Sequence, residues 1–224
     1  MRTMFTRIAR RYDLMNGLMT GGRHHAWRRI TAEALGAAPR GPVLDLATGT
    51  GDLALAVARL RPADTVVGAD FAEAMLREAA AKLRRPRAPR VPLVAADALH
   101  LPFRTHTFAA VTSAFLLRNL ADLAGGLAEM RRVTRPGGLV VTLDITRPRI
   151  PGWDSVFAFY FHRVVPAVGA LVAGDRAAYA YLPDSVDRFV SPHGLADLMR
   201  GAGLGQVRYR RLGLGTIALH VGVA

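Results

Sequence analysis

The chain has 224 residues, 51% hydrophobic and 21% charged, which is enough to bury one full core and argues against long disorder. It has no cysteine, which excludes disulfides and thiolate metal sites. The net charge of +13 comes from 30 basic residues, of which only Lys82 is a lysine. They are scattered along the sequence, so a solvated basic surface is favoured over a nucleic-acid interface. No uncharged apolar stretch reaches the length of a membrane span, and the first residues do not resemble a secretory signal; we expect a cytoplasmic protein with no spanning segment.

Apolar, β-branched runs alternate with helical patterns along the chain. We expect strands at 42–47, 65–69, 91–95, 108–113 and 139–145, and helices at 52–60, 73–83 and 122–133. Such alternation is typical of an α/β fold with a mainly parallel sheet and right-handed crossovers. The last two runs, 206–212 and 216–223, flank Gly213 and Gly215 and predict a closing antiparallel hairpin. The sequence therefore predicts one domain over 1–224, with seven strands.

Two segments stand outside this alternation. Residues 5–36 predict helices before the first strand, and residues 153–182 predict helices inserted before the final hairpin. The second segment is rich in aromatic and aliphatic side chains. Core packing and a lid over an apolar ligand explain this run about equally well.

A glycine-rich turn follows the first strand. In Asp45-Leu46-Ala47-Thr48-Gly49-Thr50-Gly51-Asp52 the glycines allow the backbone to approach a ligand, and the following helix presents free N–H groups. Residues 49–54 also match the G-x-G-x-x-A pattern of dinucleotide-binding folds, so the turn alone discriminates weakly.

Three acidic residues near strand ends distinguish the two cofactors. Asp45 repels a pyrophosphate but suits the ammonium group of S-adenosylmethionine, and Asp70 can accept both ribose hydroxyls, although a dinucleotide enzyme places an acid similarly. Asp97, followed by Ala98, is positioned to meet adenine. Helix capping explains any one of these acids, but it explains all three less well. S-adenosylmethionine is therefore the predicted cofactor.

Family-specific motifs run along nearly the whole chain. It resembles the ubiquinone/menaquinone biosynthesis C-methyltransferase family in 5–16, in Trp27-Arg28-Arg29, in Gly68-Ala69-Asp70-Phe71, in 113–119, in 179–185 and in 218–222. The resemblance implies a class I, Rossmann-like S-adenosylmethionine-dependent methyltransferase. It also implies that the cofactor contacts Thr50, Asp70, Asp97, Ala98 and Ser113, to which Asp45, Gly49 and Gly51 are added on the physical argument above.

Some positions depart from the family pattern. Leu116 stands where the family usually has glycine, and Ala109 where it usually has aspartate. We expect Leu116, beside the predicted pocket, to bear on substrate choice and Ala109 to serve local structure.

The resemblance implies a polyprenylated quinol substrate. We expect methyl transfer to a ring carbon of a demethylmenaquinol in menaquinone biosynthesis; a polyprenyl benzoquinol of ubiquinone biosynthesis and a small aromatic of secondary metabolism are the alternatives. Arg118 is the candidate that stabilises the phenolate or, through water, helps deprotonate the hydroxyl, with Asn119 and Tyr12 orienting the ring. Alternatively, Arg118 caps a helix or pairs with a carboxylate. A basic, non-catalytic cofactor-binding or RNA-binding module is the reading from a different class.

We expect no metal site, because His24 and His25 are adjacent and do not share a helix face. The helices at 1–36 and about 151–185 are expected to cover the substrate and to contact a membrane peripherally at its inner face. No nucleic-acid partner is expected, and a homodimer is left open.

Overall fold

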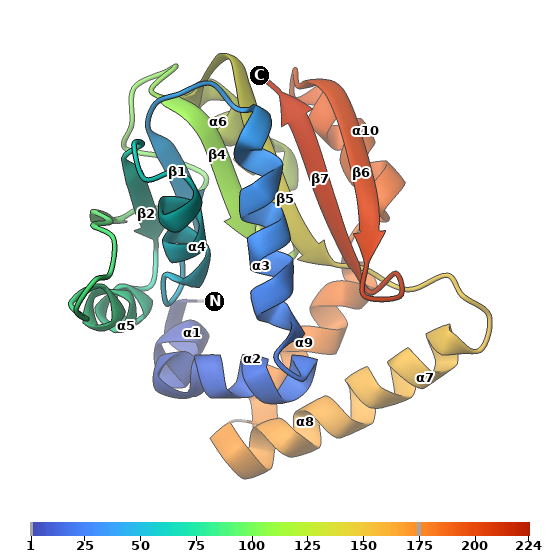
Figure 1. The fold of residues 1–224 in the computed structure, drawn as a ribbon. Helices are drawn as coiled ribbons and strands as arrows, with labels where there is room; N and C mark the ends of the chain where they lie inside the picture. Colours follow the sequence, from blue (N-terminus) through green and yellow to red (C-terminus); the bar gives the residue numbers. More distant parts are fainter. Residues whose placement is uncertain (1, 174–175) are drawn as a thin grey trace.

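The computed structural model describes residues 2–173 and 176–224 and has a seven-stranded sheet at its centre (Figure 1). The strand order is β3-β2-β1-β4-β5-β7-β6, with β7 antiparallel to both β5 and β6 and the other pairs parallel. The strands are β1 (Val43–Leu46), β2 (Val66–Asp70), β3 (Leu93–Ala95), β4 (Phe108–Ala114), β5 (Thr134–Ile145), β6 (Gly205–Leu212) and β7 (Ile217–Val223). This confirms the predicted mainly parallel sheet with its antiparallel C-terminal hairpin.

Helices cover both faces of the sheet because the strand residues alternate between two apolar cores. Val43 faces a core formed with α3 and α4, whereas Leu44 faces a core formed with α6 and α10. The helices flanking the sheet are α3 (Arg23–Glu33), η2 (Ala34–Ala37), α4 (Asp52–Leu60), α5 (Glu73–Leu83), η3 (Leu117–Asn119), α6 (Leu123–Val133) and α10 (Pro192–Gly201).

The remaining helices form a cover below the carboxyl ends of β1 and β4 (Figure 1). They are α1 (Arg2–Ile8), η1 (Ala9–Arg11), α2 (Tyr12–Thr20), α7 (Trp153–Phe159), η4 (Tyr160–Val164), α8 (Val165–Val168), η5 (Gly169–Ala173) and α9 (Arg176–Arg188). A third apolar cluster joins Met15 of α2, Met75 of α5 and Phe161 of η4. The N-terminal helices and the insert are thus packed against each other and against α5.

The predicted and observed elements differ most at β5. Helices α4 and α5 have the predicted bounds, but β5 begins at Thr134 rather than at residue 139. Thr134 pairs with Phe108, and a register shift lets the strand continue through Gly137, whose φ is 76°. The Pro-Gly-Gly segment is therefore an irregularity within the strand and not the turn that precedes it.

One helix in the insert, Trp153–Val172, is long and apolar enough to cross a membrane by length and composition, with a mean hydropathy of 1.5. Asp154 and Arg163 lie within this helix, so it is not an uncharged run, and the expectation of no spanning segment stays a prediction. Phe161 and Val165 are buried against the cover, so this helix is tied to the domain along one side.

Candidate active site

The turn between β1 and α4 has the backbone conformation that its glycines permit. Gly49 and Gly51 have φ values of 55° and 84°, in the left-handed region. A Cβ on Gly49 would meet no atom within 4 Å, which leaves open space against the backbone, whereas one on Gly51 would lie 3.2 Å from Ala79 Cβ. The absence of a side chain at Gly49 therefore leaves room for a ligand, and its absence at Gly51 allows α5 to pack close to the turn.

A cavity of about 240 Å³ lies at the carboxyl ends of β1, β2 and β4. Ala47 and Phe115, which follow β1 and β4, both line it with a positive φ, a strained conformation that is typical of functional sites. The predicted site residues in its wall are Tyr12, Gly49, Asp70, Asp97, Ala98 and Asn119. We call this space the cofactor cavity, after the prediction made for these residues.

Two backbone hydrogen bonds hold the Asp70 side chain in the cofactor cavity. Its Oδ2 accepts a hydrogen bond from Gly49 N at 2.8 Å, and its Oδ1 accepts one from Ala72 N at 2.9 Å. Burial raises its pKa above the ordinary value, although these bonds partly offset the effect. Asp97 is exposed and accepts from Leu99 N at 2.9 Å. Each carboxylate keeps lone pairs for ligand hydroxyl or amino groups, so these two acceptors fit the ribose and adenine of a nucleoside.

Four predicted cofactor residues do not reach the cavity wall. Asp45 lies within β1, fully buried, where Thr48 Oγ1 donates to its Oδ2 at 2.6 Å and burial raises its pKa to about 7. Ser113 is buried in β4, between its partners in β1 and β5. Thr50 is turned toward α2, and Gly51 caps α4. Their contact with the cofactor stays a prediction.

A larger cavity of about 390 Å³ adjoins the first, beneath the cover. Tyr12, Phe115 and Asn119 line both cavities, so each of them lies between the two spaces. The larger wall is mainly aromatic and aliphatic, with side chains from both covering segments: Met4, Ile8, Met19, Trp27, Val156, Phe157, Tyr160, Phe161, Tyr181 and Leu182. An apolar ring with a hydrocarbon tail matches such a wall.

Arg118 lines the larger cavity and is held there by Asp144, a residue that the sequence analysis did not single out. Arg118 Nη1 donates to Asp144 Oδ1 at 2.5 Å, and the two side chains are only 7% and 2% exposed. The guanidinium also lies 5.6 Å from the centre of the Phe115 ring. Asn119 Nδ2 donates to Phe115 O at 3.0 Å. The carboxylate pairing that was weighed for Arg118 is thus present, in addition to its place at the cavity.

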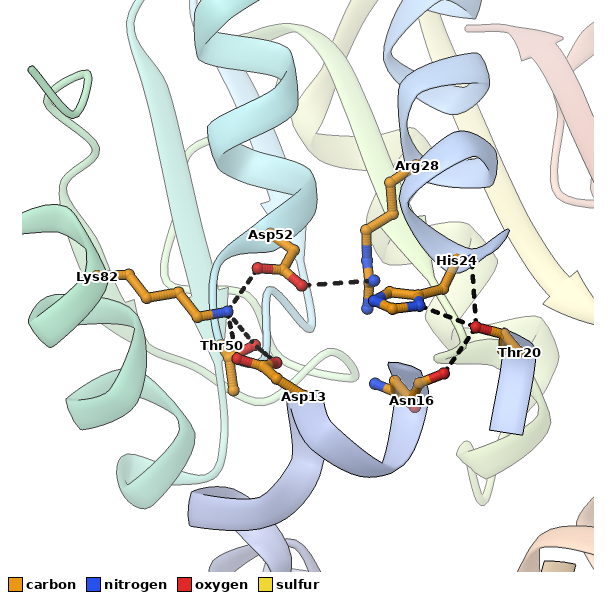
Figure 2. A network of polar contacts seen from close by, with 8 residues as sticks. All are labelled: Asp13, Asn16, Thr20, His24, Arg28, Thr50, Asp52 and Lys82. Carbon is orange, nitrogen blue, oxygen red and sulfur yellow. Dashed lines mark hydrogen bonds and ion pairs between the residues drawn. The ribbon is translucent and has the colours of Figure 1, made fainter. Parts of the chain in front are cut away.

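A polar network links α2 to the glycine turn and is centred on Lys82 of α5 (Figure 2). Lys82 Nζ lies 2.6 Å from Asp13 Oδ2, 2.5 Å from Asp52 Oδ1 and 3.0 Å from Thr50 Oγ1. Thr50 Oγ1 in turn donates to Asp13 Oδ1 at 2.6 Å. The Lys82 network (Asp13, Thr50, Asp52 and Lys82) therefore fastens the cover to the cofactor turn.

The sequence predicts that the adjacent His24 and His25 point in different directions, but the structure brings them together. The His24 and His25 rings do lie together, with centres 3.9 Å apart, and their nitrogens are within 4.8 Å of an Asp52 oxygen. Arg28 Nη1 lies 3.4 Å from Asp52 Oδ2, so this carboxylate is already shared by two cations, Arg28 and Lys82. Burial lowers the pKa of His24 to about 4, helped by Arg28. Asp52 is thus part of an ion-pair network with Arg28 and Lys82, which competes with its use as a metal ligand.

The two departures from the family pattern lie in different places. Leu116 lines the cofactor cavity and is absent from the described wall of the larger one. The Leu116 side chain therefore borders the cofactor cavity. We had expected it to border the substrate pocket and so to bear on substrate choice. Ala109 is fully buried in β4, with its N–H donating to Pro42 O at 2.8 Å.

Curated proteins of known name resemble this chain along nearly its whole length. The chain is 46% identical over 220 residues to a demethylmenaquinone methyltransferase of Thermus thermophilus, covering 98% of this chain and 99% of that protein. It is also 46% identical over 220 residues to the ubiquinone/menaquinone biosynthesis C-methyltransferase UbiE of Desulfotalea psychrophila, covering 98% and 88%.

Solved structures share the fold at low sequence identity. A S-adenosylmethionine-dependent methyltransferase of Aquifex aeolicus aligns with a TM-score of 0.68 and 16% identity, over 95% of this chain and 98% of that one. The model of the ubiE/COQ5 methyltransferase family matches residues 1–224. The chain therefore belongs to the ubiE/COQ5 methyltransferase family and is an S-adenosylmethionine-dependent methyltransferase.

Proposed function

We propose that the protein methylates a ring carbon of a demethylmenaquinol. The observation that carries this proposal is the pair of adjoining cavities with Tyr12, Phe115 and Asn119 in common. One cavity has the polar groups that suit a nucleoside, and the other is apolar and larger. The names of the relatives favour the naphthoquinol class over a small aromatic.

In this reaction the protein's side chains position the quinol and stabilise the charge that develops on it. S-adenosylmethionine supplies an electrophilic methyl group, which the ring carbon attacks as the carbon–sulfur bond breaks. A guanidinium offers hydrogen-bond donors and no acceptor, so we assign Arg118 to hydrogen bonding with the quinol oxygen as charge develops there, and not to accepting a proton. Asp144 fixes the guanidinium, while Tyr12 and Asn119 orient the ring from the shared wall. The aromatic cover excludes water from the reacting atoms.

The test is an assay of methyl transfer to reduced demethylmenaquinone, with a polyprenyl benzoquinol and a simple dihydroxynaphthalene in parallel. We expect the prenylated naphthoquinol to be the best substrate by kcat/KM. A strain that lacks the protein should accumulate demethylmenaquinone, measured by mass spectrometry. Equal turnover of the benzoquinol would point to ubiquinone biosynthesis, and turnover of the unprenylated ring alone would point to secondary metabolism.

We also propose that the cover rests on the surface of an anionic membrane, at its inner face. Five large apolar side chains of the cover are more than half exposed: Leu14, Leu18, Val156, Phe159 and Leu171. Arg11 of η1, whose Nη1 donates to Val172 O, and Arg163 of η4 are exposed in the same cover, where they suit anionic headgroups. A prenylated quinol resides in the bilayer, so this placement would bring the larger cavity to its substrate.

Vesicle flotation tests this surface. The variant Phe159→Glu/Leu171→Glu should lose binding to vesicles containing phosphatidylglycerol, whereas Leu60→Glu, on α4 at 49% exposure, should keep it. Wild-type protein that fails to float at any salt concentration would refute the membrane contact. Self-association that the double variant abolishes, without flotation, would instead indicate that a second copy covers these residues.

A further inference from the structure

The wall of the larger cavity contains buried N–H groups without hydrogen-bond partners. Asn16 Nδ2, Arg118 Nε and Trp153 Nε1 are each buried and have no partner in the part of the chain that the structure describes. They come from three separate elements, α2, η3 and α7. Buried polar groups in folded proteins are almost always paired. Three unpaired donors around one cavity therefore point to acceptor atoms on its ligand.

The other polar groups of this wall do not supply a compensating negative charge. No Asp or Glu occurs among the described residues that line it, and Asp144, which binds Arg118, lies outside it. Several polar side chains are already engaged with the backbone: Asn119 Nδ2 donates to Phe115 O, and Tyr160 Oη donates to Met19 O. The cavity thus has an excess of donors, which favours a ligand with oxygen acceptors and most of all an oxyanion.

The state of His24 strengthens this conclusion. The Thr20 hydroxyl donates to Asn16 O at 2.6 Å, so it accepts at 2.9 Å from His24 Nδ1. Nδ1 of His24 therefore carries a proton, and burial, helped by Arg28, lowers the pKa of His24 to about 4, so the ring adds no charge to the cavity at neutral pH. Arg23 is exposed at the same cavity and adds a cation near it. Arg23 thus favours an ionised substrate, and neither residue adds a negative charge.

We propose that Asn16 and Trp153 bind the ring oxygens of the substrate and, with Arg118, select its ionised form. The inference rests on the proposed quinol methylation and deepens it. The hydroxyl proton leaves to water as the substrate binds, and the resulting oxyanion raises the electron density of the ring carbon that attacks the methyl group. After the new carbon–carbon bond forms, loss of the ring C–H proton to water restores the aromatic ring as a quinolate, whose oxygen then takes a proton from water to give the quinol. In this scheme the protein stabilises the ionised oxygen with hydrogen-bond donors, and no side chain has to act as the base that removes the hydroxyl proton.

The test uses two ligands of similar size and measures binding without methyl transfer. At neutral pH 2-hydroxy-1,4-naphthoquinone is an anion, because its hydroxyl is a vinylogous acid, whereas 2-methyl-1,4-naphthoquinone is neutral. Calorimetry on the purified full chain should show that wild-type protein prefers the anion. Asn16→Leu and Trp153→Phe should each reduce this preference by about tenfold, the loss expected for one hydrogen bond to a charged acceptor.

Two further variants separate donor chemistry from packing. Asn16→Asp should weaken anion binding more than Asn16→Leu, because it places a negative charge where a donor was. Trp27→Phe alters the other tryptophan of the same wall and should leave the preference ratio unchanged. With the quinol, the Asn16→Leu and Trp153→Phe variants should show a raised KM.

The possible outcomes are distinct. Equal wild-type affinity for the two ligands, or a preference that survives both Asn16→Leu and Trp153→Phe in folded protein, would overturn the donor role. A confirmed anion preference in a protein that does not methylate the naphthoquinol would uphold the donor cavity and reject the proposed substrate. Melting curves establish that each variant is folded at the temperature of the titration.

Discussion

Replacing Lys82 by methionine removes the centre of the network that fastens α2 to the cofactor turn. Methionine has similar length and no charge, so Asp13, Asp52 and Thr50 each lose one partner. The side chains of Lys82 and Asp52 are both 17% exposed, and a hydrogen bond between ionised groups in such a setting contributes about 1.5–3 kcal/mol. Asp13 is 41% exposed, so solvent screening makes its share small.

Because Asp52 keeps Arg28 at 3.4 Å, we take the lower part of this range and expect a loss of about 2 kcal/mol in the free energy of unfolding. For a chain of this length that corresponds to a drop in Tm of about 4–8 °C. Urea unfolding measures the free energy, and calorimetry measures the Tm. Arg77→Met is the matched control on α5, since Arg77 is 78% exposed and pairs with the exposed Glu73 of the same helix; it should cost less than about 0.5 kcal/mol.

The effect has a defined pH dependence. Burial alone would raise the pKa of Asp52, but Arg28 and Lys82 more than offset this and hold it below the ordinary 3.8. A carboxyl whose folded pKa is lowered stabilises the fold above its unfolded pKa, and this contribution is lost as the pH falls through the folded value. The difference between wild type and Lys82→Met should therefore be full at neutral pH and shrink below about pH 4. A difference no larger than that of Arg77→Met, or one that does not change with pH, would refute the reasoning.

Three other predictions concern the cavities. Asp144→Asn removes the charge that holds Arg118, so kcat for the quinol should fall at least about tenfold with little change in cofactor affinity, measured by steady-state kinetics and calorimetry; an unchanged kcat would show that the pair is only structural. Asp70→Asn offers one fewer acceptor to Gly49 N, Ala72 N and the ribose, so the cofactor Kd should rise at least about tenfold in calorimetry, and an unaltered Kd would remove Asp70 from the site. Leu116→Gly should change the cofactor Kd more than the quinol KM, because Leu116 lines only the cofactor cavity of the two; the opposite result would restore its role in substrate choice.

The sequence predicted the fold well where local signals agree. The bounds of α4 follow from Gly51, which must adopt a left-handed φ just before the helix, and from the apolar spacing after it. The start of β5 was missed because Pro-Gly-Gly usually ends a strand, whereas here Thr134 finds a partner in Phe108 before the irregularity. Long-range pairing, which no local pattern encodes, decided that boundary.

The site was predictable to a different degree at each residue. Asp70 lies at a strand end, where position alone places a side chain at the cavity edge. Asp45 is one residue before its strand's last ladder position and is buried within the sheet, and Thr50 is engaged by Asp13, a partner far away in sequence. Asp144 carried a signal that was not used: a lone carboxylate inside an apolar strand is rarely buried without a cation, and Arg118 was a candidate for it.

The Lys82 network has a practical consequence, because Lys82 is the only lysine of the chain. Amine-reactive acylating reagents therefore have a single side-chain target, and its nitrogen is enclosed by Asp13, Asp52 and Thr50. A reagent has little access to a nitrogen enclosed in this way, so Lys82 should react mainly when α2 departs from the cofactor turn. The rate of acylation of Lys82, followed by mass spectrometry of the peptide, should thus serve as a clock for the opening of the cover, with no label to introduce and no residue to change.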